Sequence, residues 1–147
     1  MQGRNGMYIN EIVVRCLNLS DEKLLSLAAE NYKKVWDFIE SLKNVQDAKA
    51  QKKILTGTVF TCAAADGKLS DKEYRFILQV VGDYSRDEAI KLAEDFNCEE
   101  TRTVVRDFVR ILPEEIKEAY VAVCVATLAC DKRLKNKELK FLSFICN

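Results

Sequence analysis

The same fifteen-residue pattern occurs twice in this chain, 65 positions apart, and it restricts the possible folds more than any other feature. The two copies occupy residues 63–77 and 128–142. In each copy, small apolar residues lead through an acidic turn into a second segment whose apolar residues have helical spacing. Asp66 corresponds to Asp131, and Glu73 corresponds to Glu138. Two copies of a helix–turn–helix unit predict a pseudo-symmetric pair, because a solenoid needs more and shorter repeats.

Two apolar segments precede the two turns. Residues 54–65 and 119–130 are apolar on nearly every side, which is typical of helices surrounded by protein. Both are shorter than the ~20 residues that a membrane-spanning helix needs. We therefore expect two central helices that pack side by side and bring the two turns near one another.

Most of the other segments also have sequence patterns that predict helices. Ser20, Ser70 and Ser85 are N-cap residues before apolar runs, Gly82 is a terminator, and Pro113 suits the first position of a helix. The predicted helices cover residues 21–43, 71–81, 86–96, 99–112, 113–130 and 136–146. Residues 1–8 are polar and we expect poor order there, whereas residues 9–19 fit either a short strand or a short helix.

No segment shows sustained alternation of apolar and polar residues, so the predicted fold class is all-α. We expect a compact helical bundle of about seven helices with an internal duplication. A length of 147 residues is typical of one globular unit. In the helix over residues 99–112, the predicted buried residues are Val104, Val105, Phe108, Val109 and Leu112.

Composition excludes several classes of function. Basic and acidic residues number 23 each, which argues against a nucleic-acid-binding protein. The chain has no histidine, and so it lacks the commonest general acid–base and the commonest transition-metal ligand. It also lacks a glycine-rich phosphate loop and a nucleophile elbow. We therefore expect a protein that is not an enzyme; a carboxylate-metal hydrolase is the one enzyme class that these features leave open.

The six cysteines form no Cys-x-x-Cys pair. Most of them fall inside apolar helical patterns, which favours buried free thiols over disulfides or a zinc site. Free thiols fit a reducing compartment, and the N-terminus has no signal-peptide pattern. We expect a cytoplasmic protein.

Five carboxylates are candidate metal ligands: Asp66, Asp71, Glu73, Asp131 and Glu138. If the two turns meet, these acids share one cleft, and a hard divalent cation such as Ca²⁺, Mg²⁺ or Mn²⁺ would relieve their repulsion. In this hypothesis Asp66 and Glu73 are the primary ligands.

The alternative is that the same acids serve the fold. Glu73 completes a capping box with Ser70, and Asp66 serves its turn. Basic residues around the second copy then neutralise Asp131 and Glu138; they are Lys132, Arg133, Lys135, Lys137 and Lys140. The sequence leaves both interpretations open.

The duplicated motif resembles the TerB-like family, all-helical domains named from bacterial tellurite-resistance operons. The residues that carry the resemblance are Gly57-Thr58-Val59, Ala64-Ala65-Asp66-Gly67 with Glu73, and Ala129-Cys130-Asp131 with Glu138. The resemblance covers about residues 47–146. It predicts a TerB-like helical domain over residues 47–147, preceded by an N-terminal extension over residues 1–46 with one long helix packed on the bundle.

The resemblance implies a non-enzymatic module with an acidic, divalent-metal-binding site near the two turns, in a bacterial stress-response or defence setting. We expect another protein as the partner, and contact with a membrane-associated complex only through that partner, without direct insertion. The alternative function is a metal-free helical adaptor or scaffold whose acidic residues cap helices and form ion pairs.

Overall fold

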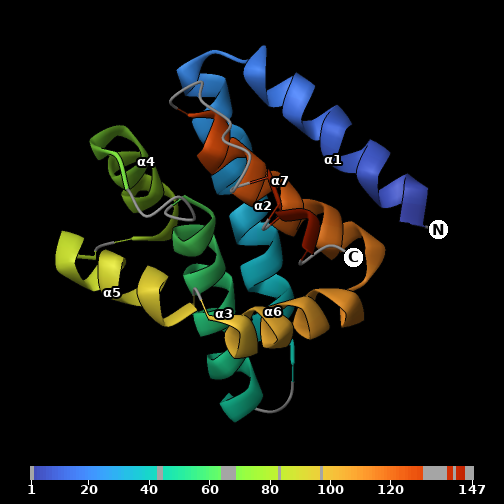
Figure 1. The fold of residues 1–147 in the computed structure, drawn as a ribbon, viewed down its shortest axis with the longest axis vertical. Coiled ribbons are helices and arrows are strands. Elements are labelled where there is room, and N and C mark those ends of the chain that lie inside the picture. The colour runs from blue at the N-terminus through green and yellow to red at the C-terminus, as the bar shows by residue number, and fades with distance from the viewer. Residues whose placement is uncertain are drawn as a thin grey trace.

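Every regular element that the computed structural model describes is a helix (Figure 1). It describes residues 2–42, 45–63, 69–82, 84–96, 98–130, 139–140 and 142–144, with the backbone alone for residues 2–8 and 45–47. The helices are α1 (Gln2–Leu17), α2 (Asp21–Glu40), α3 (Val45–Ala63), α4 (Asp71–Val81), α5 (Arg86–Phe96), α6 (Glu99–Ile111) and α7 (Glu114–Ala129). Residues 139–140 and 142–144 are also helical. The predicted all-α class is confirmed.

Helix α7 is central to the bundle. Residues 119–130 are buried without exception, as their all-apolar composition predicts. Helix α2 makes its most extensive contact with α7, and α1 and α3 also pack against α7. Figure 1 shows α7 crossing the middle of the molecule, with α1 beside it. The prediction that the two apolar helices are neighbours is confirmed by the contact of α3 with α7.

Helix α3 packs closely against α5 at a glycine. Gly57 lies opposite the ring of Phe96, and a Cβ atom added at Gly57 would lie 2.5 to 2.7 Å from three atoms of that ring. The close neighbour of Gly57 is therefore an aromatic side chain. Residues 55–63 of α3 are all buried. This part of α3 is therefore the second helical segment, after α7, that lies inside the core.

Residues 2–40 form two helices, α1 and α2, where the sequence predicted one long helix. Helix α1 begins at Gln2, so its backbone includes residues 2–8, and the expectation of poor order there stays a prediction. The choice between strand and helix for residues 9–19 is settled, because Ile9, Ile12, Val13 and Cys16 form one helical face that packs on the core. Packing of that face against α7 outweighs the weak preference of β-branched residues for strands. The boundary between residues 46 and 47 stays a prediction.

Several helix ends agree with their local signals. Helix α4 begins after Ser70 and ends before Gly82, and Gly82 has φ of 107°, a conformation that favours glycine. Helix α5 begins after Ser85 as predicted. Helix α2 ends at Glu40, three residues before the predicted end, with Ser41 as its C-cap. Pro113 is the N-cap residue of α7, one position before its predicted place.

Val104 was predicted to be buried, and the structure shows that it is exposed. Its side chain is 52% exposed, whereas Val105, Phe108 and Val109 are buried. Those three residues recur at the spacing of one helix face, and Val104 lies on the flank of that face. Helix α6 packs on α3 and α5, which leaves this flank in solvent. Of the predicted last helix, Leu142 is buried as expected, while Phe141 and Ile145 lie outside the described residues.

The cysteines of the described residues are free thiols. Cys16, Cys62, Cys124 and Cys130 are buried and Cys98 is exposed, while Cys146 lies outside the described residues. Buried free thiols were the prediction, and Cys98 is the exception to the predicted burial. Among the helices described, none combines the length and the apolar character that crossing a bilayer requires.

Candidate functional site

The described ends of the two sequence copies meet at one pocket. Lys72 and Phe76 of α4 line it together with Cys130, the C-cap residue of α7, and with Asp21 and Leu24 on the α2 side. Its volume is about 250 Å³. The start of the second helix of one copy therefore lies beside the end of the first helix of the other. The turns themselves, residues 64–68 and 131–138, lie outside the described residues.

Three of the five predicted ligands fall in those turns. Asp66, Asp131 and Glu138 lie outside the described residues, so their proximity stays a prediction. Asp71 and Glu73, both in the first turn of α4, are described. Among described residues, the structure contains no group of three or more Cys, Asp or Glu side chains placed to hold a metal ion.

Glu73 completes a capping box at the start of α4. The Ser70 backbone N–H donates to Oε1 of Glu73 at 3.2 Å, and the Glu73 backbone N–H donates to Oγ of Ser70 at 3.1 Å. This reciprocal pair satisfies two backbone donors that the first helical turn leaves open. The capping box predicted from sequence is confirmed.

The burial of Glu73 was not predicted. Its side chain is 2% exposed, which is unusual for a carboxylate. Ile77, four residues later, is fully buried, and residues four apart lie on the same helix face. The sequence signal was therefore present, since a glutamate one turn before a core isoleucine lies on the core side of its helix.

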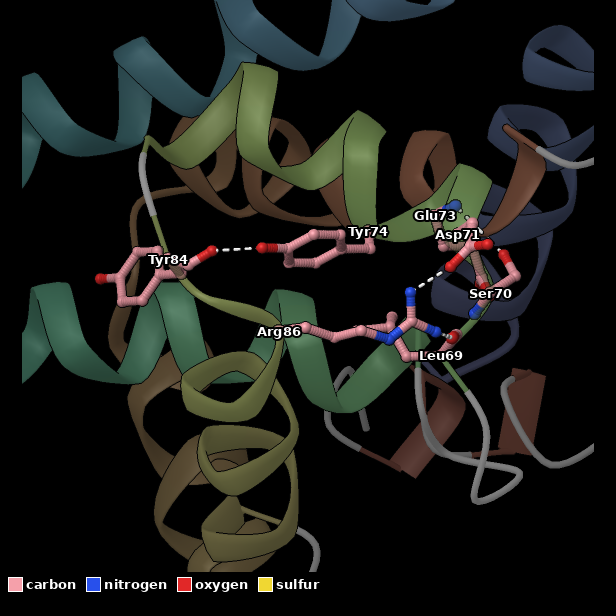
Figure 2. A network of polar contacts seen from close by, with 7 residues as sticks. All are labelled: Leu69, Ser70, Asp71, Glu73, Tyr74, Tyr84 and Arg86. Carbon is pink, nitrogen blue, oxygen red and sulfur yellow. Dashed lines mark hydrogen bonds and ion pairs between the residues drawn. The ribbon is translucent and has the colours of Figure 1, made fainter.

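Asp71 pairs with Arg86, the first residue of α5 (Figure 2). Both side chains of this ion pair are exposed, Asp71 more than Arg86. The same guanidinium also donates to the backbone carbonyl of Leu69 at 2.6 Å. Arg86 thus connects the residues before α4, the first residue of α4 and the start of α5.

Tyr74 extends this network toward the connection between α4 and α5. The guanidinium carbon of Arg86 lies 5.7 Å from the centroid of the Tyr74 ring, within cation–π distance. The Tyr74 hydroxyl donates to the backbone carbonyl of Tyr84 at 2.5 Å. Figure 2 shows these residues extending as one line from Ser70 to Tyr84. No sequence pattern indicated Arg86, because its partners are defined by the packing of α5 beside the start of α4.

A further reactive group lies at the start of α6. The exposed Cys98 is the N-cap residue of α6, and its Sγ lies 2.9 Å from Oγ1 of Thr101. Hydrogen bonding to the Thr101 side chain, supported by its backbone N–H, lowers the pKa of the Cys98 thiol below its ordinary value. Apart from the spacing of three residues at a helix start, no sequence signal pointed to this pairing.

Comparison of the chain with protein-family models, with curated proteins and with solved structures finds no match in any of the three. The fold defines an all-α protein with two buried central helices. The resemblance to TerB-like domains therefore rests on the duplicated motif alone.

Proposed function

We propose that this chain is a non-enzymatic, TerB-like helical module that acts by binding a protein partner, with Asp71 and Glu73 serving the fold rather than a metal ion. The setting is bacterial stress response or defence, as the family resemblance implies. The observation that carries the proposal is the polar network at the start of α4, in which both described candidate ligands already have partners.

Electrostatics supports this assignment of the two acids. A carboxylate beside a guanidinium has its charge compensated, and the guanidinium repels a second cation that approaches the same carboxylate. Asp71 has this arrangement with Arg86. Glu73 accepts a hydrogen bond from the Ser70 backbone and is buried, so a cation would have to displace a contact that stabilises the helix start.

The chemistry of the sequence supports binding rather than catalysis. The 147 residues contain no histidine, so a cysteine or serine nucleophile would lack the imidazole that usually activates it. A module of this kind reaches a membrane-associated complex through its partner.

A divalent-cation site is the second candidate. It would use Asp66, Asp131 and Glu138 with the buried Glu73, and it would take Ca²⁺, Mg²⁺ or Mn²⁺. The pocket shared by Lys72 and Cys130 favours it, because these residues adjoin Glu73 and Asp131 in the sequence. The two candidates therefore differ in whether the acids of the two turns share one ion.

Thermal unfolding separates the two candidates. We expect the melting temperature to be the same in millimolar Ca²⁺, Mg²⁺ or Mn²⁺ as in chelator, at constant ionic strength. The Asp66→Ala variant should behave in the same way, and Asp95→Ala, which removes an exposed acid of α5, is the matched control. A saturable rise in the native chain that Asp66→Ala abolishes and Asp95→Ala keeps would establish the cation site instead.

Two further measurements address catalysis and binding. Incubation with phosphoester substrates and Mn²⁺ should give no turnover above the buffer rate, and turnover would overturn the non-enzymatic assignment. A partner recovered from cells should bind the purified chain in a two-component titration with a defined dissociation constant. Failure of every recovered candidate in that titration would argue against an interaction module.

A further inference from the structure

Helix α6 places two arginines in one pocket on the opposite flank from Val104. Arg102 and Arg106 are four residues apart, and residues at this spacing are neighbours on a helix surface. The pocket has a volume of about 480 Å³ and is lined by Glu99, Arg102, Thr103, Arg106 and Phe144. Phe144 belongs to the helical residues near the C-terminus, so the pocket lies between two elements distant in sequence.

The positive charge in this pocket is poorly compensated. The side chain of Arg102 forms no ion pair or hydrogen bond among the contacts of the described residues. Arg106 has one ion pair, from its Nε to a carboxylate oxygen of Asp107, at the long distance of 4.0 Å. Neither arginine pairs with Glu99 within ion-pair distance in the described part of the chain.

Protein atoms cover the Nε side of both guanidiniums. The Nε atoms of Arg102 and Arg106 are covered by protein and have no hydrogen-bond acceptor, which costs free energy. The guanidinium carbon of Arg106 lies 5.1 Å from the centroid of the Phe144 ring, a distance that permits a cation–π contact. The terminal Nη groups are therefore the donors through which a ligand would be held.

These features match the requirements of an oxyanion. A guanidinium presents donors in a planar fork that fits phosphate and carboxylate groups. Arg102 is also in the first turns of α6, where the positive end of the helix dipole favours negative charge. A phosphate monoester carries nearly two negative charges at neutral pH, which suits two neighbouring guanidiniums better than a single carboxylate does.

We propose that Arg102 and Arg106 form a binding site for a phosphate group, either free phosphate or a small phosphate monoester. None of the proposed metal ligands is among the described residues that line this pocket. Thr103 contributes little, because its hydroxyl already donates to the backbone carbonyl of Glu99 at 3.0 Å in the geometry typical of a helical threonine. The Glu99 carboxylate lines the same pocket and opposes an anion.

Phosphate titration tests the site. The probes are inorganic phosphate and phenyl phosphate, added at constant ionic strength with chloride as the balancing ion. Binding is followed by calorimetry and by the side-chain NMR signals of the arginines. We expect saturable binding with a dissociation constant on the order of 1 mM or tighter, accompanied by shifts in the Arg102 and Arg106 signals.

Four variants make the test specific. The double variant Arg102→Gln/Arg106→Gln should weaken binding by about tenfold or more, and Arg102→Lys/Arg106→Lys should weaken it less, because it keeps the charge and loses the fork. Glu99→Gln should tighten binding, since it removes the opposing charge. Arg75→Gln, which changes an exposed arginine of α4, is the matched control and should leave binding unchanged.

Each outcome bears on the proposal. Tighter binding of phenyl phosphate than of phosphate supports a monoester ligand, and equal or weaker binding supports free phosphate. A response that never saturates would overturn the site. So would equal binding by the double glutamine variant, provided that its circular dichroism and melting curve match those of the native chain.

Discussion

Arg86 contacts Asp71 and the carbonyl of Leu69 at the same time, and so links the start of α5 to the start of α4. The pair with Asp71 is exposed, and exposed pairs contribute between about 0 and 1 kcal/mol. The bond to Leu69 is partly buried and joins a cation to a carbonyl, so it contributes more. We therefore expect Arg86→Gln to destabilise the protein by about 1 to 2 kcal/mol, and Asp71→Asn by less than about 1 kcal/mol.

Urea unfolding of both variants measures this difference. Arg75→Gln is the control for removing a surface arginine, and we expect little effect from it. If Asp71→Asn lowers the free energy of unfolding as much as Arg86→Gln does, the exposed ion pair accounts for the stabilisation and the hydrogen bond to Leu69 contributes little.

Glu88 gives stability a dependence on acid pH. It forms a second capping box, since the Ser85 N–H donates to its carboxylate at 3.2 Å and its own N–H donates to Ser85 Oγ at 3.1 Å. Hydrogen bonding from the Ser85 backbone lowers the pKa of the Glu88 carboxyl. Because the folded-state pKa is lowered, this contribution is present above the ordinary glutamate pKa of about 4.3. It is lost as the pH falls through the lower value in the folded protein.

The measurement is the urea midpoint from pH 3 to pH 7. We expect Glu88→Gln to be less stable than the native chain at pH 7 and to approach it at the acid end. Glu94→Gln removes an exposed glutamate of the same helix and is the control. A constant gap between Glu88→Gln and the native chain at every pH would contradict the prediction.

Gly57 is a position where alanine should destabilise a helix. Alanine is favoured over glycine in helices by about 1 kcal/mol, but its Cβ would overlap the ring of Phe96. Phe96 is buried in the core, so its ring cannot move without disturbing neighbours. Overpacking of this kind costs about 1 to 3 kcal/mol, and we expect Gly57→Ala to lower the melting temperature.

A double variant gives the physical cause of that loss. Replacing the ring with a smaller side chain in Gly57→Ala/Phe96→Leu should cost less than the sum of the two single changes, because the clash is removed. If the two single changes in stability simply add, the ring of Phe96 is not the group that clashes with a side chain at residue 57.

Cys98 should react with iodoacetamide faster than the buried cysteines. The thiolate is the reactive form, and hydrogen bonding between Sγ of Cys98 and Thr101 lowers the pKa of this exposed thiol. Thr101→Val should therefore slow alkylation near neutral pH and move the rate profile to higher pH. Mass spectrometry of peptides measures the rate in a Cys146→Ser background, which removes the cysteine outside the described residues. An unchanged profile in Thr101→Val would contradict the role of this hydrogen bond.

Local chemistry was sufficient to predict much of the fold. The capping boxes at Ser70 and Ser85 and the glycine at residue 82 define the bounds of α4 and the start of α5 within the chain itself. The apolar character of residues 119–130 predicted burial, because no helix face there is suited to solvent. Such signals act between residues close in sequence, and so they can be recognised without knowledge of how the helices pack.

Other features depend on which elements become neighbours. Helix α1 is helical because it packs on α7. Val104 is exposed because no described helix covers that flank of α6. Asp71 pairs with Arg86 because α5 begins beside the start of α4. Contacts between residues distant in sequence have no local signal, because they are set by the sum of all helix packings. The sequence alone therefore determined that the chain is helical, where most helices begin and end, and which two are buried. The tertiary structure decided that Glu73 is inside, that Arg86 compensates Asp71, and that Arg102 and Arg106 share a pocket with Phe144.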